Sequence, residues 1–127
     1  MYRRRAIEFF SGTLTAEPDF DEARVFDTTL RDGEQTPRVS FSYEDKRAIA
    51  EQLDRMGTHV IEAGFPVNSE AEFEAVRDIA EASHTTVAGL ARVVEKDVEA
   101  ALDTGVGLVH VFASTSDVQI EDSMHAT

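Results

Sequence analysis

The chain has 127 residues and a formal net charge of −13, because 25 acidic side chains face 12 basic ones. This balance argues against binding to nucleic acid or to an anionic membrane, and the absence of cysteine excludes disulfides, thiolate metal sites and cysteine nucleophiles. Only Lys46 and Lys96 are lysine, and such an acidic, lysine-poor surface predicts a halophilic source, with an ordinary acidic cytosolic protein as the alternative.

Residues 1–22 show neither the helical nor the strand period, so we expect an N-terminal extension with at most one short strand, Ile7 to Phe10. The bases Arg3 to Arg5 look like the start of an export signal, but Glu8 interrupts the apolar stretch that follows. We therefore expect neither a signal peptide nor a membrane span, and a cytoplasmic protein.

From residue 24 onward, short apolar runs alternate with helical stretches. These runs are apolar on both faces, as in a parallel sheet that is covered by helices. Four strands are predicted, at about 24–27, 59–65, 86–90 and 108–113.

The first predicted helix runs from Tyr43 to Met56. Ser42 can cap it in a capping box with Asp45, and Gly57 is expected to end it. Its apolar face is expected at Ile49, Leu53 and Met56.

Two further helices are predicted. Ser69 and Glu72 form a capping box for the second, and the third runs from about Glu95 to Asp103 and ends at Gly105. The positions expected to face the core are Phe73, Val76 and Ile79 or Ala80 in the second helix, and Val98 and Leu102 in the third.

The turn after the first strand carries the most chemistry. Residues 28–35 read Thr-Thr-Leu-Arg-Asp-Gly-Glu-Gln and place Arg31 beside Asp32 on a turn that Gly33 is expected to pin. Carboxylates on both sides add enough oxygen to hold a hard divalent cation, and the arginine can steady a developing anion. Spacing alone leaves open a surface turn in which Arg31 and Asp32 simply pair.

Leu30 to Gln35, followed by Lys46, resembles the N-terminal signature of the 2-isopropylmalate, homocitrate and citramalate synthases. These are acetyl-CoA-dependent acyltransferases built on a TIM barrel. The resemblance covers residues 24–127 and continues at Ile61 to Pro66, Gly89 to Arg92, His110 to Phe112 and Ser114 to Asp117.

The resemblance implies an α/β fold, the N-terminal half of a (β/α)8 TIM barrel with about four parallel strands and intervening helices. A complete barrel takes roughly 250 residues, whereas this chain offers four βα units at most, the last without its helix. We therefore expect residues 23–127 to be a truncated first half of a catalytic domain, inactive alone, behind an extension at 1–22.

The resemblance also implies roles in the first motif. Asp32 would bind a divalent metal (Mg, Mn or Zn) that chelates the carboxylate and ketone oxygens of a 2-oxo acid. Arg31 would bind substrate and act as a catalytic residue, stabilising the oxygen that becomes negative as the acetyl-CoA enolate attacks. Gln35 would hydrogen-bond the substrate or a metal-bound water, or would only hold the loop.

Glu62 follows two β-branched residues in a strand that is expected to be buried, so its carboxylate needs a partner. Arg31, across the barrel mouth, is the expected one. Glu62 would then orient the catalytic arginine or the substrate, or would form a structural ion pair.

Arg92 and His110 would line the 2-oxo acid pocket, although a hydrogen-bonded core histidine is an equal alternative for His110. Thr115 and Ser116 would contact the substrate by hydroxyl or backbone N–H, with an ordinary turn as the more common outcome.

The chain departs from the family pattern in two places. Arg38 stands where the family usually carries glycine, so that loop is expected to run differently. The His-x-His pair that completes the family's metal site has no counterpart, since the four histidines are isolated: His59, His84, His110 and His125.

The function implied is that of a 2-isopropylmalate synthase fragment from leucine biosynthesis, whose complete enzyme condenses acetyl-CoA with 2-oxoisovalerate and forms a homodimer. Citramalate synthase, which takes pyruvate, is the alternative within the class, and homocitrate synthase is less favoured because Leu90 to Arg92 lacks the expected histidine. The alternative outside the enzymes is a non-catalytic interaction module. It would be either a truncated gene product or one half of a split barrel that pairs with a second chain.

Overall fold

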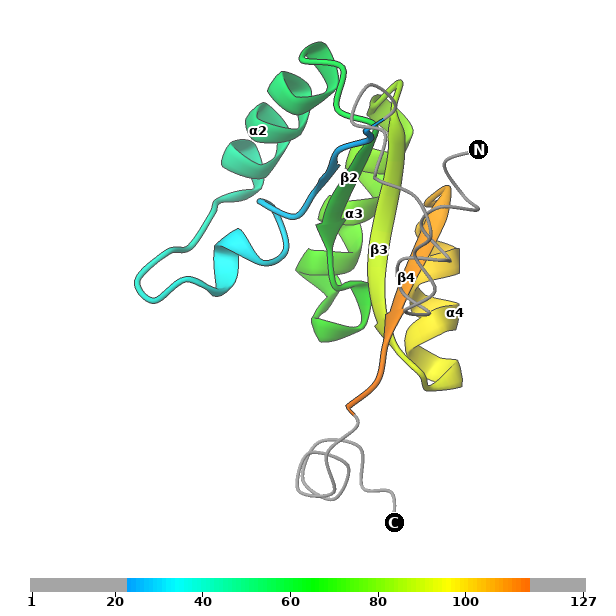
Figure 1. Cartoon of the computed structure of the whole chain (residues 1–127). Coiled ribbons are helices and arrows are strands. Elements are labelled where there is room, and N and C mark those ends of the chain that lie inside the picture. Colours follow the sequence, from blue (N-terminus) through cyan, green and yellow to red (C-terminus); the bar gives the residue numbers. More distant parts are fainter. Residues whose placement is uncertain (1–22, 115–127) are drawn as a thin grey trace.

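The computed structural model describes residues 23–114, in which three α-helices cover one face of a parallel four-stranded sheet (Figure 1). The strands, hydrogen-bonded in the order β1-β2-β3-β4, are β1 (Phe26–Asp27), β2 (Val60–Gly64), β3 (Thr86–Arg92) and β4 (Leu108–Phe112). The helices are α2 (Tyr43–Arg55), α3 (Glu70–Ala82) and α4 (Glu95–Asp103), with short 3-10 turns η2 (Gly33–Gln35) and η3 (Pro66–Asn68). The predicted α/β class, parallel pairing and strand order are confirmed, whereas the predicted strand Ile7 to Phe10 lies outside the described residues.

The register of the sheet decides which side chains share a face. Glu62 of β2 pairs with Ala88 of β3, and Leu90 of β3 pairs with His110 of β4. Because side chains alternate along a strand, Glu62, Leu90 and His110 lie on the face away from the helices, whereas Ile61 of β2 and Val87 of β3 face the helices.

The caps of α2 form as expected. The Ser42 hydroxyl accepts a hydrogen bond from Asp45 N at 3.1 Å, and the Asp45 carboxylate accepts one from Ser42 N at 2.9 Å. Gly57 after α2 and Gly105 after α4 have φ of 78° and 81°, the left-handed conformation that glycine adopts at least cost. Local sequence signals therefore mark both ends of α2 and the C-terminal end of α4.

The capping box expected for α3 is only half formed, which corrects the prediction. Ser69 Oγ accepts from Glu72 N at 3.1 Å, but the Glu72 carboxylate does not return to the Ser69 backbone. It instead accepts from Phe65 N at 3.1 Å and pairs with Lys46. A stronger cationic partner from another helix thus replaces the local bond.

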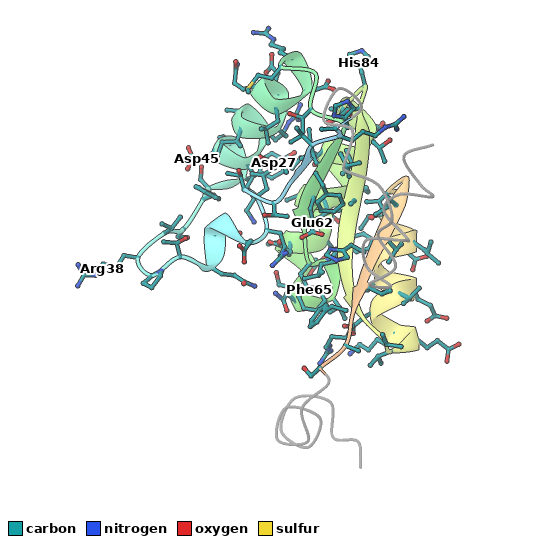
Figure 2. All side chains as sticks on the ribbon, in the orientation of Figure 1. Asp27, Arg38, Asp45, Glu62, Phe65 and His84 are labelled. Atoms are coloured by element: carbon teal, nitrogen blue, oxygen red, sulfur yellow. The ribbon has the colours of Figure 1, made fainter. Side chains whose placement is uncertain are left out.

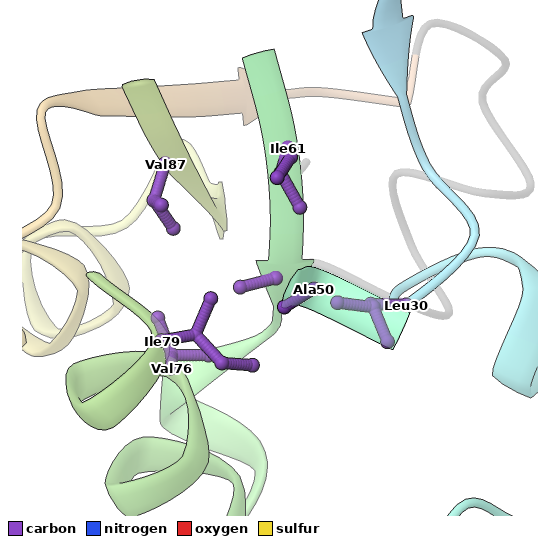
Figure 3. Packing of buried hydrophobic residues seen from close by; sticks show 7 residues of the cluster. Leu30, Ala50, Ile61, Val76, Ile79 and Val87 are labelled. Carbon is purple, nitrogen blue, oxygen red and sulfur yellow. The ribbon is translucent and has the colours of Figure 1, made fainter. Parts of the chain in front are cut away.

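The core lies between the sheet and helices α2 and α3 (Figure 3). Half-buried Ile49 and Leu53 of α2 flank it, as predicted. Its buried members are Leu30, Ala50, Ile61, Ala63, Val76, Ile79 and Val87.

Two residues predicted on the apolar helix faces are solvent-exposed. Met56 is 78 % exposed because it lies after the last residue of α2, beyond the sheet. Leu102 is 57 % exposed because the buried positions of α4 are Asp97 and Ala101, and the next residue is rotated away by about 100°.

None of the helices described between residues 23 and 114 is both long and apolar enough to cross a bilayer.

Candidate active site

The Arg-Asp-Gly motif lies on a tight turn at the carboxyl end of β1. The backbone N–H groups of Arg31, Asp32 and Gly33 all donate to the carbonyl oxygen of Thr28, at 3.2, 2.7 and 3.2 Å. Leu30, directly before Arg31, is fully buried in the core and anchors the turn. An apolar anchor is thus followed directly by the two charged residues that the turn presents at the edge of the sheet.

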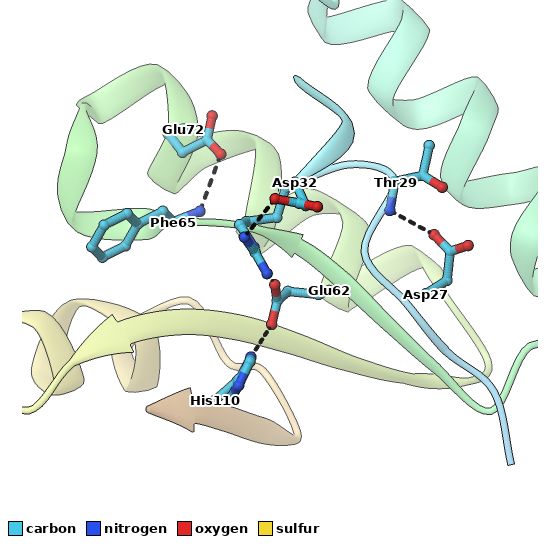
Figure 4. A network of polar contacts seen from close by, with 8 residues as sticks. Asp27, Thr29, Asp32, Glu62, Phe65, Glu72 and His110 are labelled. Atoms are coloured by element: carbon cyan, nitrogen blue, oxygen red, sulfur yellow. Dashed lines mark hydrogen bonds and ion pairs between the residues drawn. The ribbon is translucent and has the colours of Figure 1, made fainter. Parts of the chain in front are cut away.

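Glu62 joins the side chains of Arg31 and His110 at this edge. Its carboxylate is fully buried and accepts hydrogen bonds from Arg31 Nε through Oε1 and from His110 Nδ1, 2.5 Å away, through Oε2 (Figure 4). The expected Arg31–Glu62 pair is therefore present, and His110 is brought to the same carboxylate. A buried carboxylate held from both sides fixes the planes of both partners.

A cavity of about 340 Å³ opens beside this bridge, at the carboxyl ends of the strands. Two pairs of rings pack edge-on at the site: Phe26 against His110 at 5.5 Å, and Phe65 against Phe112 at 6.2 Å. The cavity combines two polar groups and one cation with an apolar floor. Its lining residues are Arg31, Gln35, Phe65, Leu90, His110 and Phe112.

Asp32 lies at the rim of the site and is 63 % exposed at its side chain. Its Oδ1 is 3.2 Å from Arg31 Nη1. Within residues 23–114, no group of three or more His, Cys, Asp or Glu side chains is arranged to hold a metal ion. The described residues alone therefore do not fit a divalent cation, and Asp32 offers one carboxylate ligand.

Arg92 is held by α4. Its Nε and Nη2 donate to the two carboxylate oxygens of Asp97 at 2.7 and 3.0 Å, and its backbone N–H donates to the same carboxylate at 3.1 Å. The hydrogen bond from Arg92 lowers the pKa of Asp97, against the opposing effect of burial. Among the described residues, Arg92 does not line the cavity with Arg31, and Thr115 and Ser116 lie outside the described part of the chain.

Sequence reasoning missed a second ionic cluster behind the motif. The Lys46 ammonium of α2 lies 2.7 Å from Glu72 Oε2 and 2.9 Å from Glu34 Oε2, and Lys46 is buried. Burial lowers the pKa of Lys46, but hydrogen bonds and charges from Glu72 and Glu34 outweigh it and raise that pKa overall. The only signal in the sequence was the presence of Lys46 in the family motif.

The space around the backbone requires glycine at position 64 but not at position 33. A Cβ on Gly64 would lie 2.2 Å from Glu72 Oε1, so only glycine leaves room for this carboxylate. A Cβ on Gly33 would meet nothing closer than Thr29 at 3.6 Å, an ordinary contact. The expectation that Gly33 pins the turn is therefore wrong, because the shared Thr28 carbonyl holds it.

The loop between η2 and α2 bends at Arg38, which has φ of 68° and lies at the tip of the loop (Figure 2). This is the position where the resemblance predicted glycine. The chain keeps the left-handed conformation there without glycine, at a cost of about 1 kcal/mol.

Comparison with known proteins agrees with the fold. A family model described as HMGL-like matches residues 22–127. The crystal structure of HMG-CoA lyase from Bacillus subtilis superimposes with a TM-score of 0.69 at 25% identity, covering 87% of this chain and 39% of that one. The four strands and three helices thus correspond to part of a TIM barrel.

Curated relatives point to one branch of the family. A protein named "Probable 2-isopropylmalate synthase" from Methanosarcina mazei is 58% identical over 117 residues, covering 91% of this chain and 22% of its own length. A 2-isopropylmalate synthase from Listeria welshimeri is 54% identical over 103 residues, covering 77% and 20%. The chain spans about a fifth of the length of these relatives. It belongs to the HMGL-like family and is related in sequence to 2-isopropylmalate synthases.

Proposed function

We propose that the chain carries the 2-oxo acid side of a 2-isopropylmalate synthase-type active site, an acyltransferase of leucine biosynthesis. The observation that carries this proposal is the buried Glu62 carboxylate, which holds Arg31 and His110 together beside the cavity. The whole enzyme would condense acetyl-CoA with 2-oxoisovalerate.

Arg31 has the donors that the chemistry needs. A guanidinium has five N–H groups, and the described contacts use two of them, on Nε and Nη1. The remaining N–H groups can donate to the keto oxygen of a 2-oxo acid in the cavity. As the acetyl carbon attacks, that oxygen becomes negative, and a fixed permanent cation stabilises it without reorganising.

The floor of the cavity favours a branched substrate. Phe65, Leu90 and Phe112 offer apolar surface that suits the isopropyl group of 2-oxoisovalerate. Pyruvate, the substrate of citramalate synthases, would leave part of this surface uncovered. The missing methyl groups of pyruvate change the free energy of binding by only about 1–3 kcal/mol. Pyruvate is therefore the main competing substrate.

Other proposed contacts extend this site. Gln35 would hydrogen-bond the substrate from η2, and His110 would contact its carboxylate end, whereas contacts by Arg92 and Thr115 stay predictions. In the complete enzyme, Asp32 would give one ligand to a divalent metal (Mg, Mn or Zn), which acts as a Lewis acid when bound. A homodimer in the cytoplasm completes the proposal.

A chimera tests the proposal. The chain replaces the matching segment of the Methanosarcina mazei relative, and CoA release from acetyl-CoA is assayed with 2-oxoisovalerate and with pyruvate. We expect turnover that depends on 2-oxoisovalerate, while the isolated chain shows none. A folded chimera that is inactive with both acids, or active only with pyruvate, would contradict the assignment; the unmodified relative is the control.

A further inference from the structure

Three elements that are distant in sequence meet at Lys46. Its ammonium, on α2, lies between the carboxylates of Glu34 on η2 and Glu72 on α3, at 2.9 and 2.7 Å. Lys46 is 7 % exposed. A buried charge of this kind is tolerated only when paired and hydrogen-bonded, so the position of each carboxylate depends on the ammonium.

The second oxygen of each carboxylate holds a backbone N–H. Glu34 Oε1 accepts from Phe41 N at 3.3 Å, and Glu72 Oε1 accepts from Phe65 N at 3.1 Å. The bond to Phe65 fixes the chain where it leaves β2, just after the glycine at 64 whose missing side chain makes room for the Glu72 carboxylate. One ammonium thus ties the turn of the motif to the end of β2.

This ionic cluster adjoins the candidate active site. A second cavity of about 220 Å³ is lined by Glu34 and Glu72 and shares Arg31, Gln35 and Phe65 with the first. Glu34 lies on the same turn of chain as Arg31 and Gln35, within four residues of both. A change in the position of Glu34 is therefore expected to move one or both of these side chains.

Lysine is the side chain that this geometry requires. An ammonium is a compact charge with three donors pointing in different directions, so it can serve two carboxylates from different elements. A guanidinium is planar and longer, and its fork matches one carboxylate. The chain uses arginine at ten of its twelve basic positions, yet the buried position carries lysine.

We propose that Lys46 is a positioning residue of the active site, which sets Arg31 and Gln35 through Glu34 and fixes the exit of β2 through Glu72. The role of Arg31 toward substrate rests on the proposed function, whereas the coupling between Lys46 and Arg31 does not. Lys46 itself does not line either cavity.

The experiment compares Lys46→Met with Lys96→Met in the full chain. Lys96, the other lysine, is exposed on α4 and is the matched control. The Nε–Hε NMR signal of Arg31 reports on its bond to Glu62, and thermal melting reports on stability. In Lys46→Met, we expect this signal to shift and its exchange with water to become about tenfold faster, with Lys46→Arg restoring the signal only in part.

A merely structural lysine would lower the melting temperature of Lys46→Met and leave the Arg31 signal as it is in Lys96→Met, which would overturn the proposal. If Lys46→Met does not fold, Glu34→Gln takes its place, because Glu34 is less buried and only one pairing is lost; an unchanged Arg31 signal there would also overturn it. Turnover by the chimera distinguishes the coupling of Lys46 to Arg31 from the proposed function of the site. A shifted Arg31 signal together with an inactive chimera supports the coupling and counts against the proposed function.

Discussion

Glu62 and His110 are 48 residues apart in the sequence, and their side chains meet at 2.5 Å across the intervening strand β3. The same carboxylate accepts a hydrogen bond from Arg31 at the end of β1. One buried charge therefore orients the two side chains on either side of the cavity. Each of these groups depends on Glu62 for its position.

Glu62→Gln is expected to lower kcat of the chimera about 100-fold, because displacement of a catalytic group by about 1 Å costs that much. The amide keeps the size of the side chain and loses the charge that holds Arg31. Steady-state assays of CoA release give kcat and KM. Glu51→Gln, at an exposed ion pair on α2, is the control, and equal rates in the two variants would refute an orienting role.

Gly64→Ala is expected to reduce the free energy of unfolding by about 1–3 kcal/mol, because its Cβ would overlap the Glu72 carboxylate. Gly33→Ala, whose Cβ meets only an ordinary contact, should change it by less than about 0.5 kcal/mol. Urea titrations of both variants and the parent chain measure the difference. The reverse order would show that the turn of the motif, and not the end of β2, is the constrained position.

Asp97→Asn is expected to make the free energy of unfolding less dependent on pH in acid. The hydrogen bond from Arg92 lowers the pKa of Asp97 in the folded state. Its stabilisation is therefore present above the usual carboxyl pKa of about 4 and is lost as the pH falls through the lowered folded-state value.

Unfolding by urea, measured from neutral pH to well below pH 4, follows this effect. At neutral pH, Asp97→Asn should be less stable than the parent by about 1–3 kcal/mol, and the gap should narrow in acid. Asp103→Asn, exposed at the end of the same helix, is the control. A gap that stays constant with pH would show that the charge of Asp97 contributes nothing.

The isolated chain is expected to associate with itself as the salt concentration rises. Phe26, Val111 and Phe112 are exposed apolar residues on β1 and β4, the two edge strands of the described sheet. A net charge of −13 opposes association at low salt, and screening within about 3 Å at 1 M removes this repulsion.

Light scattering across a salt series follows this association. Val111→Ser should weaken it, and Val93→Ser, exposed beyond the end of β3, should not. A compact monomer at every salt concentration would contradict the expectation. Melting temperatures measured across the same salt series test the halophilic source, because a halophilic chain should gain thermal stability with salt.

Local signals in the sequence predicted most of the fold. Ser42 with Asp45 marked the start of α2, Gly57 and Gly105 marked helix ends, and the apolar runs marked all four strands. These features act within a few residues, so a pattern can show them. The Arg31–Glu62 pair was also expected, because a buried carboxylate needs a cation.

The remaining features depend on contacts between distant residues. Asp97 occupies a buried position of α4 because Arg92 pairs with it, so the hydrophobic pattern wrongly placed Leu102 there. Glu72 pairs with Lys46, 26 residues away, and so leaves its local capping box. Inside an amphipathic helix, a charged residue such as Asp97 is predicted to face solvent, and only its ion pair with Arg92 of β3 explains why it is buried.

The most direct measurement is the crystal structure of the chimera with 2-oxoisovalerate bound. We expect the keto oxygen within hydrogen-bonding distance of the Arg31 guanidinium, roughly 2.7–3.2 Å, with Glu62 still bridging Arg31 and His110 and the isopropyl group against Leu90. A 2-oxo acid bound away from Arg31, or an Arg31 released from Glu62 in the complex, would contradict this expectation.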